Sequence, residues 1–378
     1  MRREFGIIRR KPVYLLGSVG VMVFSCLFYL TFFKAGLPED IPIGIVDGDN
    51  TSLSRNFCQQ LDATQLGKVV YFDDFTSARN ALQEGRIASL CVIPEHMSED
   101  VYANRQPVFT YYVNSLYMIS GALSYKDVLT MVTLTGGAVV RETLRAKGYP
   151  DQIIMGAIQP IVIDEHKIGN ATTNYGVYLN NIILPGLLQL SIIFVLIYAL
   201  GSELRYKTSK ELMEAADGSI ATAIIGKLTP YTLIYLVLGL TLDFLMFGVC
   251  KYPLAGDIGW MMLAMVALIL ASEGVAVTLI GLLPTLRYAL SVAALFTILA
   301  FSFSGFTFPI EALPVALQGA AVLFPLRFYY LFYVQEAIFG AGFAAWWPYL
   351  LAMLAFLIGP VLVSGRLKNA YIKQNYEV

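Results

Sequence analysis

Six apolar stretches of about 20 residues each constrain this chain more than any other feature of its sequence. A helix that crosses a lipid bilayer needs roughly 20 predominantly apolar residues. The composition agrees, because 57% of the 378 residues are apolar and only 14% are charged, against ~25% charged in soluble domains. The sequence therefore predicts an α-helical membrane protein with six transmembrane helices. The expected spans are residues 13–33, 182–200, 228–249, 259–283, 288–308 and 345–364.

Basic residues in the short loops predict which side of the membrane each loop faces. Lysine and arginine are enriched in cytoplasmic loops. Thirteen of them lie in the N-terminal segment, in the loops after the second and fourth spans and in the C-terminal tail, whereas the short loops opposite hold only Lys251 and Arg327. We therefore expect a multi-pass protein of the cell inner membrane, with both termini in the cytoplasm and residues 34–181 outside it. The first span is longer than the ~7–15-residue core of a signal peptide and is expected to remain as an anchor.

Residues 41–113 alternate short β-rich runs with helical patterns. This alternation is typical of a small α/β domain with a parallel or mixed sheet. The expected strands are 43–47, 68–72, 88–93 and 108–113, and the expected helices are 52–61, 76–85, 95–103 and a longer one that ends near Ala146. Ser52 is expected to cap the first of these helices. We assign residues 34–181 to an inserted extracytoplasmic α/β domain.

Residues 117–140 compete for a place among the membrane spans because they are fairly apolar. Lys126 and Asp127 lie at the middle of this stretch, where each charge costs at least a few kcal/mol in lipid. A seventh span would also invert the charge rule for every later loop. We therefore expect a long amphipathic helix within the external domain.

No segment of the sequence has the spacing of a catalytic or metal site. Asp47-Gly48-Asp49-Asn50 resembles the start of a calcium loop but lacks its distal glutamate, so a turn before a helix cap is the better interpretation. His96 and His166 lie far apart, and neither has a second ligand nearby. Cys58 and Cys91 form either a disulfide or two buried thiols, and sequence leaves both open. We expect no enzyme activity, metal or cofactor in this chain, and its net charge of −1 gives no sign of nucleic-acid binding.

Residues 1–11 form a short basic amphipathic pattern before the first span. Met1, Phe5 and Ile8 fall on one helical face, and Arg2, Arg3, Arg9 and Arg10 fall on the other. Such a helix lies along a membrane surface, with its basic face toward lipid headgroups or solvent.

Residues 203–219 form the longest internal loop on the expected cytoplasmic side. The loop has a mostly helical and charged pattern, and it either docks a soluble partner or simply connects two spans. Gly226-Lys227 is the only Gly-Lys pair in the chain and is followed by Leu228, so the chain lacks the phosphate-binding P-loop motif. Any ATP-driven work must come from another polypeptide.

Two acidic residues, Asp243 and Glu273, lie within expected spans. Intramembrane charges usually face a cavity or a partner, and they mark function more often than exposed charges do. Both are candidates for a transport path, and the alternative is a structural hydrogen bond or a protonated acid. Residues 309–342 are apolar, but three prolines break them into pieces too short to cross the membrane: Pro309, Pro314 and Pro325. We expect a re-entrant hairpin at the outer side, with a pair of surface-lying helices as the alternative.

Two segments together carry a family resemblance. The first runs from Glu203 through Thr208 and Glu211-Leu212 to Gly226-Lys227 and Pro230. The second contains Ser304-Gly305-Phe306, Phe308-Pro309-Ile310-Glu311, Pro314 and Phe324-Pro325-Leu326-Arg327-Phe328-Tyr329. With one anchor span, a large external domain that opens with IPIGIVDGDNTSLSRNF and five later spans, the chain resembles the membrane subunits of the type-2 permease family of ATP-binding-cassette (ABC) exporters over almost its whole length.

The resemblance implies a role for each segment. It implies that residues 1–12 are the elbow helix, that 203–219 are the loop coupled to an ATPase, and that 309–342 are an outer re-entrant hairpin within a five-helix domain, 182–378. The site residues implied are Glu203, Thr208, Glu211 and Leu212 for coupling, and Pro309, Glu311, Pro314, Pro325 and Arg327 for the hairpin. Gln335-Glu336 stand where the family has an arginine.

The resemblance also implies partners. These are an ABC ATPase subunit that holds ATP and magnesium, a second permease subunit, membrane lipid and, in this form of the family, a periplasmic adaptor and an outer-membrane channel. The aromatic and aliphatic spans suggest amphipathic drugs or lipids as the exported substrate. The alternative function is a membrane-anchored sensor or assembly scaffold that uses an external binding domain and transports nothing.

Overall fold

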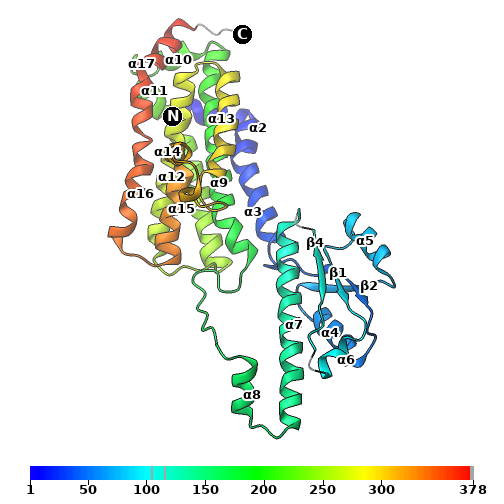
Figure 1. Cartoon of the computed structure of the whole chain (residues 1–378). Helices are drawn as coiled ribbons and strands as arrows, with labels where there is room; N and C mark the ends of the chain where they lie inside the picture. Colours follow the sequence, from blue (N-terminus) through cyan, green and yellow to red (C-terminus); the bar gives the residue numbers. More distant parts are fainter. Residues whose placement is uncertain (104, 115, 375–378) are drawn as a thin grey trace. The chain divides into compact units, whose positions relative to one another are not determined.

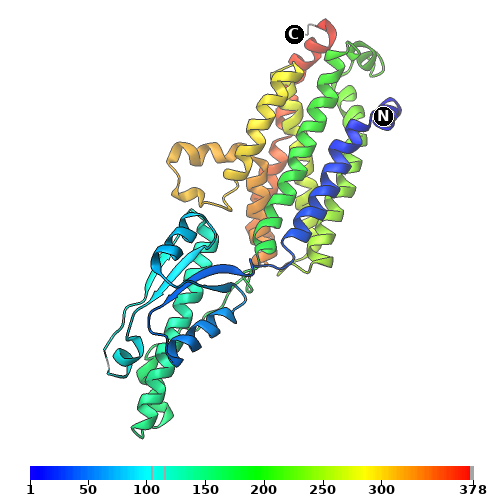
Figure 2. The ribbon, with the colours of Figure 1, turned by 90° about the vertical axis from the view of Figure 1, so that its right-hand side faces the viewer.

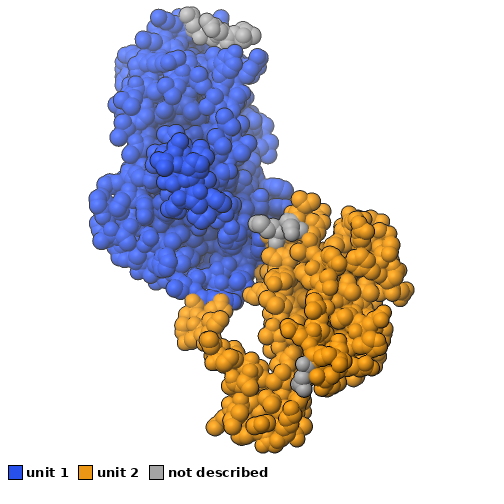
Figure 3. Space-filling model, in the orientation of Figure 1, with its two compact units in different colours: residues 1–36, 167–378 blue, residues 37–166 orange. Residues whose placement is uncertain are grey.

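The computed structural model describes residues 1–103, 105–114 and 116–374, and these divide into two compact units (Figures 1 and 3). Unit 1 comprises residues 1–36 and 167–378, and unit 2 comprises residues 37–166. Helices make up most of the chain, and a small sheet is present, which confirms the helical membrane-protein class. Each unit is described by itself below.

Unit 1 contains five helical runs that are long and apolar enough to cross a membrane. These runs are Pro12–Phe32, Tyr175–Arg205, Ile220–Val249, Ile258–Leu282 and Phe343–Lys373. A further apolar helix, α13 (Leu286–Ser302), has 17 residues, which at 1.5 Å per residue gives about 25 Å, the lower end of what a span needs. The predicted stretch 288–308 is therefore helical only as far as Ser302.

Some of these runs are single α-helices, and others contain a short π-helical segment or a break of two residues. They are α2 (Pro12–Leu15), η1 (Leu16–Gly20) and α3 (Val21–Phe32); α9 (Tyr175–Arg205); α11 (Ile220–Asp243) and η2 (Phe244–Val249); α12 (Ile258–Leu282); and α16 (Phe343–Ala355) with α17 (Ile358–Lys373). Among the short helices outside the runs are α1 (Arg2–Arg10) and α10 (Ser209–Glu214). Figures 1 and 2 show the N-terminus, α10 and the last turns of α17 at the same end of this bundle.

The centre of unit 1 is formed by α9 and α12, which bury most of their residues, whereas the other spans bury only a minority of theirs. Glycines allow close packing here. At Gly274 of α12, a Cβ atom would lie 2.6 Å from the carbonyl oxygen of Phe356. Because no real Cβ tolerates that contact, glycine is required where α12 passes the break between α16 and α17.

A sharply bent pair of helices follows α13. It consists of α14 (Val315–Ala320) and η4 (Ala321–Leu323), then α15 (Pro325–Tyr333) and η5 (Val334–Ile338), with η3 (Ile310–Ala312) before them. The two arms meet at 92°, the geometry of a broken span or a re-entrant loop. The three prolines lie at helix starts as expected, because proline lacks the N–H that a first helical turn does not need. The re-entrant placement itself remains a prediction.

Unit 2 is built on a four-stranded sheet with strand order β2-β1-β3-β4. Its strands are β1 (Ile41–Asp47), β2 (Gly67–Tyr71), β3 (Ser89–Ile93) and β4 (Thr110–Val113). Both β2 and β3 run parallel to β1, and β4 is antiparallel to β3. The four strands expected from the sequence are confirmed to within two residues, and the sheet is mixed.

Helices cover both faces of this sheet (Figure 2). They are α4 (Ser52–Asp62), α5 (Phe75–Gln83), α6 (Met97–Tyr102) and α7 (Met118–Ala146). The last helix of the unit, α8 (Asp151–Ile158), packs against α7. Ile43 and Ile45 of β1 pack with α4, α6 and α7, whereas Val46 packs with α5 on the opposite face. Successive strand residues point to opposite faces, so β1 is buried from both sides. Helix α7 is not among the runs apolar enough to span a membrane, as expected.

Two local expectations in unit 2 change in detail. The cap of α4 is Thr51 rather than Ser52, because Thr51 and Ser54 form a reciprocal capping box. Asp47 accepts hydrogen bonds from the backbone N–H groups of Asp49 and Asn50, both at 3.1 Å, which confirms a turn. Among the described residues, no three His, Cys, Asp or Glu side chains gather as a metal site. Cys58 and Cys91 are free thiols buried in the same core.

Candidate functional site

A cluster of buried charges lies at the end of unit 1 that carries the N-terminus, α10 and the last turns of α17. The Lys227 Nζ atom lies 2.8 Å from Glu4 Oε2 and 2.8 Å from Glu203 Oε1. The lysine side chain is 1% exposed and each glutamate side chain 3%. These residues belong to α11, α1 and α9, so one ammonium group joins α9 and α11 to a helix that lies about 200 residues earlier in the sequence.

Further donors complete the hydrogen bonding of the two carboxylates. Arg3 donates two hydrogen bonds to Glu203, at 2.9 and 3.1 Å. The Tyr231 hydroxyl donates to Glu4 at 2.9 Å, and the Thr208 hydroxyl donates to the other oxygen of Glu203. We call this set the Lys227 cluster: Arg3, Glu4, Glu203, Thr208, Lys227 and Tyr231.

The electrostatics of the Lys227 cluster are balanced. Two carboxylates face one ammonium and one guanidinium group. Burial disfavours the charged form of Arg3, but its hydrogen bonds and charge interaction with Glu203 outweigh burial and raise the pKa of the guanidinium. A buried ion pair repays its desolvation cost only when its remaining polar atoms are satisfied. The Lys227 cluster meets this condition, so it holds α1, α9 and α11 in one fixed arrangement.

The loop 206–219 adjoins the Lys227 cluster and has two different sides. One side of its helix α10 is anchored to unit 1. Ser209 donates a hydrogen bond to the Tyr371 carbonyl of α17 at 2.8 Å, and Leu212 and Met213 are buried. The opposite side carries exposed charges at Lys210, Glu211 and Glu214. The structure therefore presents a short, firmly seated helix with a free polar face.

A comparison with known protein families decides what kind of chain this is. The model of the ABC-2 family transporter proteins matches residues 13–366, nearly the whole chain. The chain belongs to the ABC-2 transporter family. This confirms the resemblance to type-2 permeases and gives the chain the role of an ABC transporter permease, a membrane component that is not normally catalytic itself. No match to a curated protein was found.

The residues that the resemblance implied for coupling to an ATPase fall in different places of the structure. Glu203 and Thr208 belong to the Lys227 cluster, with Glu203 in the last turn of α9. Leu212 lies on the buried face of α10. Glu211 is 70% exposed and lies 3.6 Å from Arg3 at the edge of the Lys227 cluster. The helical part of 203–219 is shorter than expected, because residues 215–219 form turns with a left-handed backbone at Asp217 and Gly218.

The expectation for residues 1–11 is wrong at Arg3. That side chain turns inward to Glu203 instead of toward headgroups or solvent, because a buried carboxylate is a stronger partner than either. On the apolar face, Ile8 is buried in the core, whereas Met1 and Phe5 are exposed. The side chain of Arg2 lies outside what the structure describes.

Sequence reasoning missed Glu4 and Tyr231, and it used Lys227 only as a loop charge, in excluding a P-loop and as part of the family resemblance, never as a buried charge. Two signals were present. Glu4 is the one acid among the arginines of α1, and Lys227 begins an apolar run in which an unpaired ammonium is costly. Each signal calls for a buried partner of opposite charge, and the structure shows that they are partners of each other.

The two intramembrane candidates lie on different helices of the permease. Glu273 of α12 accepts a hydrogen bond from the Thr232 hydroxyl of α11 at 2.7 Å. Asp243 of α11 is fully buried, and neither of its carboxyl oxygens has a hydrogen-bond partner among the described residues. For Glu273, this contact is the structural hydrogen bond that the sequence analysis gave as the alternative to a role in a transport path. Asp243 has no such bond among the described residues.

At the bent pair, the structure brings Glu311 and Arg327 to 3.9 Å from each other. The Arg327 side chain is 15% exposed and the Glu311 side chain 82%, so this pair lies at a rim and contributes little. A stronger contact involves Glu336, which is buried and accepts the backbone N–H of Asp257 at 2.7 Å. Glu336 therefore fastens η5 to the loop between α11 and α12.

Proposed function

We propose that this ABC-2 permease is the membrane subunit of an exporter of the cell inner membrane, with both termini in the cytoplasm. Two permease subunits would enclose the path, and a separate ATPase subunit would bind ATP and magnesium and drive transport. The observation that carries the proposal is the placement of loop 206–219 against the Lys227 cluster. Helix α10, which has an exposed polar face, lies where the Lys227 cluster joins α1, α9 and α11 of unit 1.

The geometry suggests how force would pass from the ATPase to the spans. The exposed face of α10 offers Lys210, Glu211 and Glu214 to a soluble partner. A groove of about 240 Å³ beside the Lys227 cluster, between α1, α10 and α11, has room for a partner's side chain. Because the Lys227 cluster holds α9, α11 and α1 together, a push on α10 would move them as one body.

The charge distribution supports the proposed orientation. Arg3, Lys210 and Lys373 lie on segments gathered at one end of unit 1, and the hydrogen bond of Ser209 to Tyr371 joins two of these segments directly. An excess of lysine and arginine marks the cytoplasmic side. Unit 2 would then lie outside, where a periplasmic adaptor and an outer-membrane channel would continue the route. Amphipathic drugs or lipids are the substrates that suit the apolar spans.

Co-purification tests the proposal. The full chain is extracted under mild conditions, and its partners are identified and counted by mass spectrometry. We expect an ABC ATPase in stoichiometric amount. A triple variant, Lys210→Ala with Glu211→Ala and Glu214→Ala, should insert normally and lose the ATPase, whereas Lys251→Ala, an exposed lysine outside this loop, should keep it. Recovery of the chain without any ABC ATPase would contradict the proposal and favour the sensor or scaffold function.

A further inference from the structure

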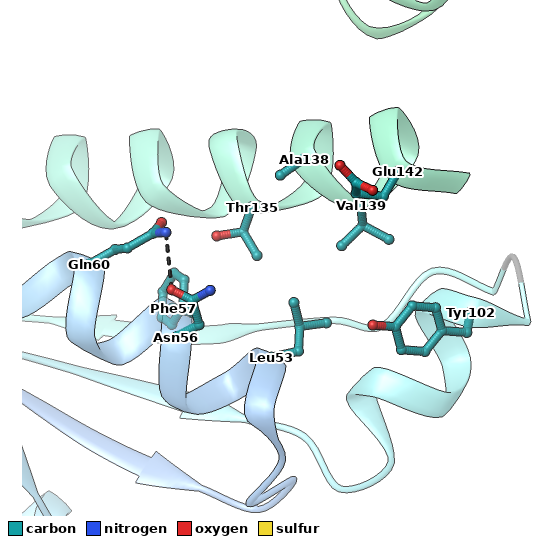
Figure 4. A pocket seen from close by; sticks show the side chains of 9 residues that line it. All are labelled: Leu53, Asn56, Phe57, Gln60, Tyr102, Thr135, Ala138, Val139 and Glu142. Carbon is teal, nitrogen blue, oxygen red and sulfur yellow. Dashed lines mark hydrogen bonds between the residues drawn. The ribbon is translucent and has the colours of Figure 1, made fainter. Parts of the chain in front are cut away.

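Unit 2 carries a groove of about 210 Å³ between α4 and α7 (Figure 4). Helix α4 contributes one stripe of side chains, Leu53, Asn56, Phe57 and Gln60. Helix α7 contributes a facing stripe, Thr135, Ala138, Val139 and Glu142. Both stripes follow i, i+3, i+4, i+7 spacing, which places their members on one helical face. At 1.5 Å per residue, each stripe is about 10 Å long.

The floor and the two ends of the groove differ in chemistry. The floor is apolar, with Phe57 1% exposed and Leu53 and Val139 half-buried. At one end, the Gln60 amide donates a hydrogen bond to Asn56 at 3.1 Å. Glu142 and the ring of Tyr102, from the end of α6, lie together at the other end (Figure 4). The groove therefore has a neutral polar end and an acidic aromatic end.

The acidic end has no partner within unit 2. Glu142 forms no ion pair and no hydrogen bond through its carboxylate with any residue that the structure describes. Tyr102 is 68% exposed. Unit 2 as a whole holds nine basic and sixteen acidic residues, a net charge of −7. Glu142 is the one charged side chain among the residues that line the groove, so its charge and the net charge of unit 2 both favour a basic partner over an acidic one.

We propose that this groove is a docking site for an amphipathic helix of a separate protein, with a lysine or arginine at one end of its apolar face. Helices that bind in grooves insert apolar side chains at i, i+3 or i+4 and i+7, and a groove about 10 Å long takes two such turns. The basic side chain would lie between the Glu142 carboxylate and the Tyr102 ring, where ion pairing and cation–π attraction act together.

The size of the groove favours a helix over a small ligand. Drug-sized ligands occupy pockets of roughly 300–1,000 Å³, which is more than this groove offers. Ala138 keeps the groove open, because its small side chain lies between Thr135 and Glu142 on the facing stripe (Figure 4). The proposal stands apart from the permease function, since it concerns unit 2 alone.

Selection of peptides tests the proposal. The full chain in lipid nanodiscs is used to select from a displayed library of 16-residue helical peptides, with empty nanodiscs as counter-selection against lipid binding. We expect enriched peptides with an apolar stripe and a terminal lysine or arginine. Their affinity should fall about tenfold for Glu142→Gln and more for Ala138→Trp, which fills the groove. Asp73→Asn removes the same charge from an exposed site elsewhere in unit 2 and should leave binding unchanged.

Exchanging the charges of Glu142 and of the peptide's terminal basic residue is the most direct test. Glu142→Lys should abolish binding of a selected peptide, and replacing the peptide's terminal basic residue by glutamate should restore it. Thermal unfolding of each variant checks that unit 2 stays folded. Enriched peptides that bind Ala138→Trp and Glu142→Lys as well as the parent chain would overturn the proposal. A library that yields only acidic or non-helical peptides would overturn it as well.

Discussion

Lys227 holds the one ammonium group that neutralises two buried glutamates from different helices. Replacing it by a methionine of similar length would leave Glu4 facing Glu203 with only Arg3 to balance them. Breaking a buried ion pair in this way typically costs about 3–5 kcal/mol. We therefore predict that Lys227→Met lowers the free energy of unfolding by about that amount, measured by denaturant titration of the purified protein.

Two controls separate charge from bulk at this position. Lys227→Arg keeps the charge and should lose much less stability, whereas Lys210→Met removes a lysine from the exposed face of α10 and should change stability little. If Lys227→Met unfolded at the same denaturant concentration as the parent chain, the Lys227 cluster would not be the tie between α1, α9 and α11.

Asp243 poses the opposite case, a buried carboxyl group whose oxygens have no hydrogen-bond partner among the described residues. A buried polar group left unsatisfied costs about 1–3 kcal/mol. We predict that Asp243→Leu, which is similar in size, leaves the free energy of unfolding unchanged or raises it by up to about this amount. Thermal unfolding and ATPase activity of the assembled transporter are the measurements. Loss of ATPase activity in a well-folded variant would instead place Asp243 in the transport path.

Residues of the Lys227 cluster differ in how far sequence could identify them. Glu203 and Thr208 could be singled out because they lie in a segment with a family resemblance. Glu4 stands out as the one acid among the arginines of α1, but the sequence does not say which residue is its partner. Its partner Lys227 lies 223 residues away. Only the packing of α1 against α11 brings the two together.

At the scale of elements, strands and long helices followed from residue patterns, and their ends did not. β1 alternates side chains for two faces, so its position is fixed by burial. Helix α13 ends at Ser302, before the end of the apolar stretch, and the chain then turns through Gly305, whose left-handed backbone has a φ of +93°. Apolar composition alone does not predict such a turn.

The packing of α4 against β3 leads to a prediction about two thiols. Burial raises the pKa of Cys58 to about 11 and that of Cys91 to about 12. Both therefore remain protonated at pH 8, and their alkylation should be roughly a hundredfold or more slower than that of exposed Cys250. The measurement is the rate of maleimide modification in single-cysteine and paired variants, before and after denaturation.

The same pKa shifts set the direction of a pH effect. An unfolded chain releases its thiol protons near ~8.5, whereas the folded chain holds them to about 11 and 12. The stability of unit 2 should therefore be fully present below pH ~8.5 and decline as the pH rises above it.

The alkylation experiment also has an outcome that would contradict the free thiols. Failure of both cysteines to react after denaturation without reductant would instead show a disulfide between Cys58 and Cys91.

For the whole molecule, charge separates the two units. Unit 1 has a net charge of +6 and unit 2 a net charge of −7. Composition identified a multi-pass membrane protein at once, and loop charges gave it an orientation. Neither could reveal the groove of unit 2 or the Lys227 cluster, because both depend on side chains that meet only after folding.

The central claim is that loop 206–219 faces the cytoplasm, where an ATPase can bind it, while unit 2 lies on the other side of the membrane. Glu211→Cys and Asp73→Cys, each introduced alone into a chain with Cys26→Ala and Cys250→Ser that keeps only the buried Cys58 and Cys91, test this directly with a membrane-impermeant maleimide on intact cells. We predict that position 73 is labelled from outside and position 211 only after permeabilisation. Labelling of both positions from the same side would contradict the account.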